Sequence, residues 1–388
     1  MKKYITVLWL FFVLLISAQV ENSQNIAGFR GSRILSSYPN NQFPNPNYWA
    51  NAGEFISNKF SNVSPAAIWI VSLYLSGGYT QLNFPNPGGN YPYVYFIGSD
   101  YNESYLTLFD LKGIKVWLQV EPGAANIDTL IHIVLNKYKH HSCVAGFGID
   151  VEWYNTQSNS GGQKVTDIEA KRWEKKVKSI DSNYTLFLKH YGQNWMPPTY
   201  RGDILFVDDS QDFTSLSAMV SEFKAWGNKF KPNKVAFQFG YPIDKPWWSK
   251  LNDPIKTIGN SLFTNISNCH GVFWVDFTIN DVYPITSIKS DEPTSPSQFS
   301  VSQNYPNPFN PSTKFSVYVP ESGFLACEIY DLTGRKVGSV FRNRLNEGLH
   351  NFEWTAETLS SGIYLLKVNF TDDQNKIYTY INKMCLVK

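Results

Sequence analysis

Residues 144–153 read Val-Ala-Gly-Phe-Gly-Ile-Asp-Val-Glu-Trp, a run of six apolar or glycine residues that leads into two carboxylates, Asp150 and Glu152. Such a continuous run is typical of a strand buried on both faces, as in a parallel sheet covered by helices. Residues i and i+2 of a strand point to the same face, so both carboxylates are expected side by side at its carboxyl end.

Seven further runs of this kind surround it. They are Ile26–Arg33, Ala66–Ser76, Ile114–Glu121, Tyr184–Tyr191, Ile204–Asp209, Lys234–Tyr241 and Gly271–Phe277. Stretches with helical 3.6-residue spacing separate several of them, namely Tyr48–Phe60, Ile127–Tyr138, Val165–Ile180 and Leu216–Trp226. Eight strands alternating with helices predict an α/β fold, a (β/α)8 barrel over residues 19–284. The Gly/Pro/Tyr-rich stretch Tyr79–Tyr95 is expected to be a long loop. An open doubly wound sheet is the alternative, but no Gly-rich phosphate loop follows the first strand.

The two ends of the chain have other compositions. Residues 1–18 contain Lys2, Lys3, an apolar run and a small-residue exit, which predicts a secretory signal peptide. No other apolar stretch approaches 18 residues, so no integral membrane segment is expected after its cleavage. Residues 285–303 are rich in Ser, Pro and Thr and are predicted to be a linker.

Residues 304–388 change to short alternating strands with turn signals between them. The expected strands are Lys314–Val319, Leu325–Asp331, His350–Trp354, Gly362–Phe370 and Lys376–Val387. This spacing predicts a small all-β sandwich. The chain has four cysteines, too few and too scattered for a disulfide framework or a zinc site. One bridge between Cys327 and Cys385 is possible.

Four motifs in this region occur in a fixed order. They are Asn304–Thr313 (NYPNPFNPST), Ile329–Arg335 (IYDLTGR), Leu359–Tyr364 (LSSGIY) and Lys383–Lys388 (KMCLVK). Together they resemble the C-terminal sorting domain of the bacterial type IX secretion system, also called the Por secretion tail. The resemblance implies that the type IX machinery is a partner and that the protein is secreted or attached to the outer cell surface.

The charge balance limits the choice of ligand. Thirty-four basic and 32 acidic side chains give a net charge of +2, which does not favour a nucleic-acid partner. Aromatic residues make up 16% of the chain and are suited to stacking against sugar rings. His190, His270 and the pair His140–His141 show no metal-ligand spacing on one face, so no metal and no cofactor is expected.

In a barrel, the active site lies at the carboxyl ends of the strands. Acidic residues gather there: Glu121, Asp150, Glu152, Asp208, Asp209 and Asp276. Two carboxylates in a partly dry cleft push their pKa values apart, and one stays protonated as a general acid. We expect Asp150 and Glu152 to be catalytic. The residues expected to bind substrate are Glu121, Asp208, Gln238, Tyr241, Trp274 and Asp276.

The run Ala145–Glu152 resembles the strand-four signature of glycoside hydrolase family 18, which contains chitinases and endo-β-N-acetylglucosaminidases. The family pattern is Asp-Gly-apolar-Asp-apolar-Asp-any-Glu; the chain matches it at Gly146, Phe147, Ile149, Asp150 and Glu152 and departs from it at Ala145 and Gly148. Gly271–Trp274 resembles the family's final strand, while Val207 stands where the family has a tyrosine.

The resemblance implies roles for four of the predicted site residues. Glu152 would protonate the leaving oxygen, and the substrate's own acetamido oxygen would attack the anomeric carbon. Asp150 would orient the acetamido group, Asp208 would bond it, and Trp274 would form the floor under the sugar. Lysozymes of another D-x-E barrel family are a further resemblance, but the first strand lacks an acidic partner.

These observations predict a secreted barrel hydrolase acting on a β-linked, N-acetylated glycan. The absence of acids at positions 145 and 148 leaves two alternatives on the same scaffold. One is a carbohydrate-binding barrel without catalysis, and the other is a surface adhesion protein.

Overall fold

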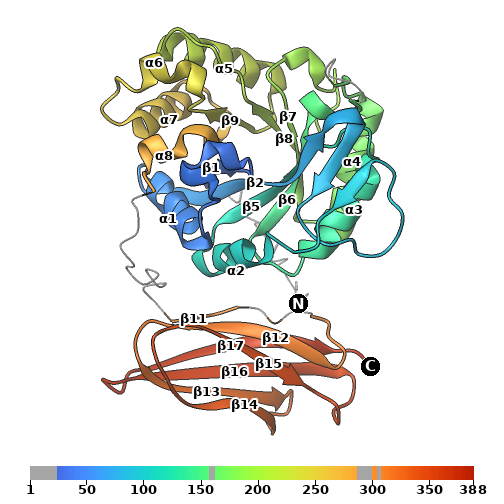
Figure 1. Cartoon of the computed structure of the whole chain (residues 1–388), viewed down its shortest axis with the longest axis vertical. Coiled ribbons are helices and arrows are strands. Elements are labelled where there is room, and N and C mark those ends of the chain that lie inside the picture. Colours follow the sequence, from blue (N-terminus) through green and yellow to red (C-terminus); the bar gives the residue numbers. More distant parts are fainter. Residues whose placement is uncertain (1–23, 157–161, 286–298, 303, 305–306) are drawn as a thin grey trace, which may run out of the picture.

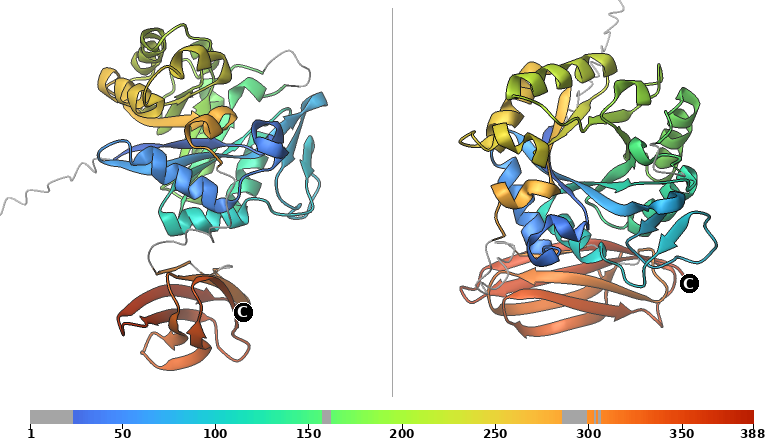
Figure 2. Two further views of the ribbon diagram at one scale, coloured as in Figure 1. Left: turned by 60° about the vertical axis from the view of Figure 1, so that its left-hand side comes forward. Right: turned by 45° about the horizontal axis from the view of Figure 1, so that its top comes forward.

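The computed structural model describes residues 24–156, 162–285, 299–302, 304 and 307–388. They form a barrel and a separate β-sandwich (Figures 1 and 2). The predicted signal peptide and most of the predicted linker lie outside the described residues. Within the described ranges, no helix combines the length and apolar character needed to cross a membrane.

Eight parallel strands close into the barrel. They are β1 (Asn25–Gly31), β2 (Val63–Leu75), β5 (Lys115–Val120), β6 (Val144–Asp150), β7 (Thr185–Lys189), β8 (Ile204–Asp208), β9 (Val235–Phe239) and β10 (Cys269–Val275). Each pairs with the next along the chain, and β1 pairs with both β2 and β10, which closes the circle. The predicted (β/α)8 fold is confirmed, and each of the eight predicted strands overlaps one of these.

Helices cover the outside of the barrel (Figure 1). They are α1 (Pro46–Ser57), α2 (Glu103–Lys112), α3 (Ile127–Tyr138), α4 (Asp167–Ile180), α5 (Leu216–Phe230), α6 (Lys245–Trp248), α7 (Pro254–Asn265) and α8 (Ile279–Val282). The four predicted helices correspond to α1, α3, α4 and α5. Polar caps fix their starts: the side chain of Asn126 accepts the backbone N–H of Thr129, and Thr166 forms a capping box with Glu169.

The stretch expected to be a long loop contains two short strands. β3 (Tyr79–Leu82) continues antiparallel from β2, and β4 (Val94–Phe96) pairs with β3. This extension widens one side of the barrel before α2 returns the chain to β5.

Side chains alternate between two cores along the barrel strands. Those that point outward pack against the helices, for example Phe29, Phe147 and Phe206. Those that point inward fill the barrel and are Ile26, Ala66, Ile68, Trp117, Phe187, Leu205, Val207, Ala236 and Phe273. The inward layer is apolar along the amino-terminal part of the strands, so the barrel is a packed core and a ligand can enter only above it.

The sandwich contains two antiparallel sheets. One is β11 (Ser300–Val301), β12 (Ser312–Val319) and β15 (Gly348–Thr355); the other is β14 (Lys336–Leu345), β13 (Gly323–Asp331), β16 (Gly362–Asp372) and β17 (Ile377–Leu386). β14 was not predicted, and β11 lies inside the segment predicted as linker. All four cysteines are free. The possible bridge between Cys327 and Cys385 is not formed, because β16 lies between their strands β13 and β17.

Candidate functional site

Polar side chains replace apolar ones at the carboxyl end of the inward-facing layer. Arg30, Gln119, Asp150, Lys189 and Gln238 follow inward-pointing apolar or glycine residues on five different strands, and all five are buried. Buried charges persist only when they are paired or hydrogen-bonded. Their partners therefore define the chemistry of the barrel mouth.

Lys189 lies between two carboxylates. Its Nζ is 2.7 Å from Oδ2 of Asp150 and 2.5 Å from Oδ2 of Asp209. Gln119 also donates its Nε2–H to Oδ2 of Asp150 at 3.3 Å. We call Asp150, Lys189 and Asp209 the lysine triad; it carries two acids for one base.

This imbalance affects protonation. Burial raises the pKa of Asp150 to about 8; Lys189 opposes that shift, while the charges of Asp209 and Glu121 add to it. Burial by itself would lower the pKa of Lys189, but Asp150 and Asp209 raise it well above its usual range. The lysine therefore stays charged, and Asp150 holds a proton near neutral pH.

A second buried pair closes the other side of the mouth. Arg30 on β1 donates from Nε to Oδ1 of Asp276 at 2.8 Å and also from Nη2. Ser32 and Tyr38 donate to the other oxygen of Asp276. Asp276 is fully buried in these contacts. Asp276 therefore holds the end of β1 in place through Arg30 and Ser32. The sequence analysis had predicted that Asp276 contacts the substrate.

Glu152 lies above the lysine triad. Because β6 ends at Asp150, Glu152 is in the 3-10 turn Val151–Trp153 and not on the strand as predicted. The half-buried carboxyl makes no hydrogen bond to any described residue. Burial raises its pKa; Lys189 and Arg30 oppose the rise, and Asp209 contributes to it.

Glu121, at the end of β5, is an electrostatic neighbour of Glu152. Its Oε2 accepts the backbone N–H of Tyr74 at 2.8 Å. Burial raises the pKa of Glu121, and the charge of Glu152 adds to the rise. The mouth thus brings together Glu121, Asp150 and Glu152, three of the predicted site residues.

Several buried polar atoms below these carboxyls have no partner among the described residues. They are Oε1 of Gln119, Oδ1 of Asp150, Oδ1 of Asp209 and Nε2 of Gln238. Tyr241, also buried, donates its hydroxyl to the other end of the Gln238 amide at 3.4 Å. Because unpaired buried polar atoms are costly, this floor is suited to a polar ligand or to ordered water.

Two predicted site residues point away from the mouth. Trp274 packs against Phe239 and Trp248 in the outer core, is 0% exposed, and donates Nε1–H to Thr278 at 2.9 Å. Asp208 is likewise fully buried, and its Oδ1 accepts from the backbone and hydroxyl of Ser210. Neither offers a surface to a sugar in this structure, and Asp209 reaches the mouth in place of Asp208.

The position where the family 18 pattern has an acid is filled from the neighbouring strand. A Cβ on Gly148 would lie 2.0 Å from Cζ of Phe187. The Phe187 ring therefore occupies the space that a side chain at position 148 would need. An acid could stand here only if Phe187 were also replaced.

Aromatic rings surround the mouth. Tyr74 stacks on Trp153 with ring centroids 4.6 Å apart, and His190 stacks on Trp195 at 4.5 Å. Trp153 and Trp195 are partly exposed. Such rings can pack against the CH face of a sugar.

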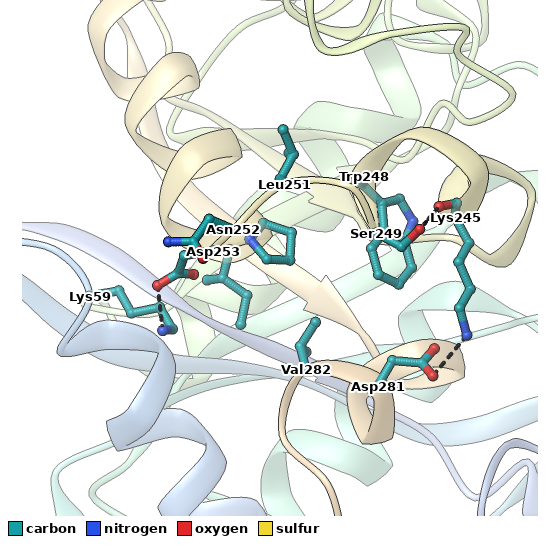
Figure 3. Close-up of a pocket in the computed structure, with 11 residues that line it drawn as sticks. Lys59, Lys245, Trp248, Ser249, Leu251, Asn252, Asp253, Asp281 and Val282 are labelled. Atoms are coloured by element: carbon teal, nitrogen blue, oxygen red, sulfur yellow. Dashed lines mark hydrogen bonds and ion pairs between the residues drawn. The ribbon is translucent and has the colours of Figure 1, made fainter.

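A pocket outside the barrel mouth is shown in Figure 3. It is lined by Lys59, Lys245, Trp248, Ser249, Leu251, Asn252, Asp253, Pro254, Ile255, Asp281 and Val282. Both acids are paired, Asp253 with Lys59 at 2.7 Å and Asp281 with Lys245 at 2.8 Å. None of the predicted site residues lines it.

Sequence reasoning gave no role in the site to Arg30, Gln119, Lys189 or Asp209, although Asp209 was among the acids expected at the strand ends. The available signal was a charged residue inside an apolar strand, as in Asn25–Gly31 (NIAGFRG) and Thr185–Lys189 (TLFLK). A charge can be buried there only with an opposite charge nearby.

Comparison with known proteins identifies the C-terminal unit. Residues 303–382 match the family described as the secretion system C-terminal sorting domain. This confirms the predicted sorting domain and indicates a protein that is secreted or attached to the cell surface. A search of curated proteins finds no significant match.

Among solved structures, latent PorU from Porphyromonas gingivalis is 22% identical, with a TM-score of 0.20, and the match covers 22% of this chain and 9% of PorU. A putative β-galactosidase from Bacteroides fragilis is 8% identical (TM-score 0.36), covering 93% of this chain and 55% of that protein. The endo-fucoidan hydrolase MfFcnA9 of glycoside hydrolase family 107 is 10% identical (TM-score 0.37), covering 95% and 81%. At these TM-scores the three structures say nothing about the activity of this chain.

Proposed function

We propose that the barrel is a glycoside hydrolase that cleaves a β-linked, N-acetylated glycan outside the cell, with Glu152 as the general acid. The observation that carries the proposal is the half-buried Glu152 carboxyl at the barrel mouth, whose pKa is raised and which no described residue hydrogen-bonds. A general acid must hold a proton near the working pH and must be able to present it to the substrate. Burial shifts the pKa of Glu152 in the direction that favours the protonated form, and the half-buried carboxyl could present that proton to a substrate.

Asp150 has the properties of the second functional group. Its Oδ2 is held by Lys189, while Oδ1 has no partner among the described residues and can accept a hydrogen bond. As the family 18 resemblance implies, the ionised form of Asp150 would receive the acetamido N–H on that oxygen and orient the carbonyl oxygen for attack on the anomeric carbon. The glycosidic bond breaks as the carbonyl oxygen bonds to the anomeric carbon and the Glu152 proton passes to the leaving oxygen. Water would then open the resulting ring, with the ionised Glu152 taking a proton from the water.

The fixed charges of the mouth would support this step. Lys189 and Arg30 are both buried and paired, so they hold their positions without reorganising during the reaction. The partly exposed rings of Trp153 and Trp195 would take flanking sugar units.

The test is turnover by the Glu152→Gln variant. The chain from Gln19 onward is assayed with chromogenic N-acetylglucosaminides, chitooligosaccharides and peptidoglycan, and products are followed by mass spectrometry. Loss of the proton donor should cut turnover by about 10²–10⁴-fold while substrate binding is retained. The matched control is Glu222→Gln on α5, an exposed glutamate outside the mouth, which should not alter turnover. Turnover close to wild type in Glu152→Gln would remove this residue from the mechanism.

A carbohydrate-binding protein without catalysis is the second candidate. The Phe187 ring favours it, because that ring occupies the space of an acid present in the family 18 pattern. In that case calorimetry should detect oligosaccharide binding by both wild type and Glu152→Gln, and neither should release product.

A further inference from the structure

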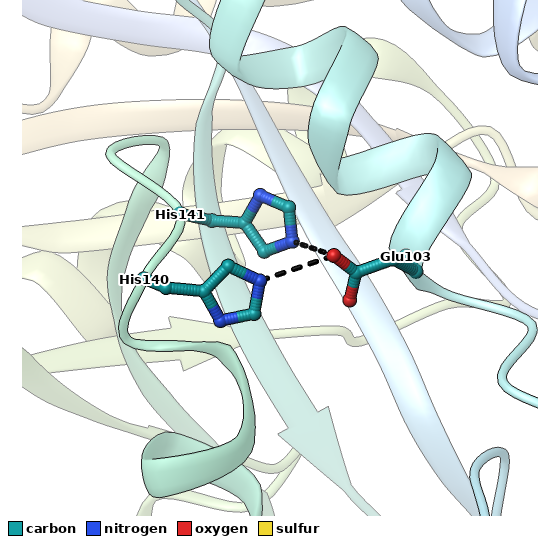
Figure 4. A group of neighbouring side chains, drawn as sticks. All are labelled: Glu103, His140 and His141. Atoms are coloured by element: carbon teal, nitrogen blue, oxygen red, sulfur yellow. Dashed lines mark hydrogen bonds and ion pairs between the residues drawn. The ribbon is translucent and has the colours of Figure 1, made fainter. Parts of the chain in front are cut away.

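A cluster of metal-binding residue types lies away from the barrel mouth. Glu103 is the first residue of α2, and His140 and His141 lie between α3 and β6 (Figure 4). The histidines precede the amino end of β6, whereas Asp150 is at its carboxyl end, about 20 Å away for a seven-residue strand. The cluster is therefore separate from the proposed active site, and the inference does not depend on it.

The three side chains converge on one point. Nε2 of His140 is 3.1 Å and Nε2 of His141 is 3.3 Å from the same oxygen, Oε1 of Glu103. Ligands at about 2.0–2.1 Å from a tetrahedral zinc ion lie about 3.3 Å from one another. Two of the three separations thus match the edge of a zinc coordination tetrahedron, and all three ligand atoms lie within 4.8 Å of one another.

A further hydrogen bond fixes the orientation of His141. Its Nδ1 is 2.6 Å from Oδ2 of Asp110. A carboxylate only accepts, so Nδ1 carries the proton and the lone pair of neutral His141 is on Nε2. Asp110 is itself held by the backbone N–H of Cys143 at 2.6 Å and by the hydroxyl of Ser142 at 3.1 Å. A carboxylate behind a metal-bound histidine is a frequent arrangement at zinc sites.

Hydrogen bonding within the cluster does not account for His141. Its Nε2 is buried and makes no hydrogen bond to any described residue, although the Glu103 oxygen is 3.3 Å away. The nitrogen therefore faces a negative oxygen without an aligned proton between them.

We propose that Glu103, His140 and His141 bind a divalent transition-metal ion, with zinc as the best fit and a water molecule in the fourth position. Two imidazole nitrogens and one carboxylate oxygen are ligands suited to zinc. The ion would tie the start of α2 to the connection between α3 and β6. This reverses the sequence-based expectation that the paired histidines bind no metal.

An overlapping group of side chains supplies an internal alternative. Asp110, His141 and Cys143 also lie close enough together to hold an ion. However, the Cys143 thiol is buried and donates to the carbonyl of Leu106 at 3.5 Å, and Asp110 is already hydrogen-bonded to His141. The two ligand sets differ in Glu103 and Cys143, so single substitutions separate them.

The experiment uses the chain from Gln19 onward, stripped with a chelator and then dialysed against micromolar zinc chloride. Mass spectrometry of the metal content should give one zinc per chain. Added zinc should raise Tm with the logarithm of its free concentration, as for a ligand that binds the folded state. Cobalt chloride, used as a spectroscopic probe, should give the visible absorption of a tetrahedral site.

The variants test the ligands. Glu103→Gln and His140→Gln should lose the bound zinc and the cobalt absorption while keeping the circular dichroism of wild type. His132→Gln, an exposed histidine on α3, and Cys143→Ser should keep both signals. The proposal is overturned if wild type retains no stoichiometric zinc, if Glu103→Gln still binds it, or if Cys143→Ser loses it.

Discussion

Replacing Asp150 by Asn should change how the stability of the protein depends on pH. The lysine triad contains two carboxylates for one lysine, and Asp150 and Asp209 are 2% and 7% exposed. Burial, with the charges of Asp209 and Glu121, raises the pKa of Asp150 to about 8, against about 3.9 in an unfolded chain. Between these values the folded chain binds one more proton than the unfolded chain.

The sign and size of the effect follow from this proton. Since the folded state holds the extra proton, the free energy of unfolding falls as pH rises from about 4 to about 8. One full proton corresponds to about 1.36 kcal/mol per pH unit, or about 2.7 kcal/mol between pH 5 and pH 7. In Asp150→Asn, Lys189 and Asp209 form a balanced pair, so this contribution to the slope should disappear.

The assay is urea unfolding of the chain from Gln19 onward at pH 5, 6, 7 and 8. Asp209→Asn should reduce the slope in the same way, because either substitution leaves one acid for one lysine. Asp281→Asn is the control, since that exposed aspartate pairs with Lys245 on the surface. Parallel pH profiles for wild type and Asp150→Asn would refute the assignment of the extra proton to the triad.

Two further substitutions test packing around the site. Trp274→Ala should lower the free energy of unfolding by about 3–5 kcal/mol, because the ring is fully buried against Phe239 and Trp248. Unchanged stability together with weakened glycan binding would instead show that Trp274 contacts the sugar. Gly148→Ala should cost about 1–3 kcal/mol because its Cβ would overlap the Phe187 ring. Adding Phe187→Leu should recover part of that loss, and failure to do so would show that the ring is not the obstacle. Both are measured by urea unfolding at pH 7.

The barrel could be predicted because its strands are long apolar runs at regular intervals. Runs such as residues 144–149 are typical of strands that are covered on both faces. The helices α2 and α7 were not predicted because their sequences mix apolar positions with Ser, Thr, Asn or Gly. Packing against the sheet supplies the stability that such sequences lack.

The face of each strand was harder to predict than the strand itself. In a parallel barrel both faces are apolar, so alternation does not say which residues point inward. In Ile204–Asp208 the inward residues are Leu205 and Val207, and the next inward position is Asp209. The sequence analysis chose Asp208, one residue out of phase, which moves a side chain from the mouth to the outer core.

A buried charge could have fixed the phase. Lys189 is the one charged residue of Thr185–Lys189, and a lysine cannot lie between a sheet and apolar helices without a counter-charge. It must therefore point inward, where the acids of neighbouring strands end, and Phe187 two residues earlier points inward with it. By the same reasoning, the buried Arg30 shows which residues of β1 point into the barrel. These two cations, which are absent from the D-x-E pattern, hold the ionic network of the mouth in place, so a motif search restricted to acids found only part of the site.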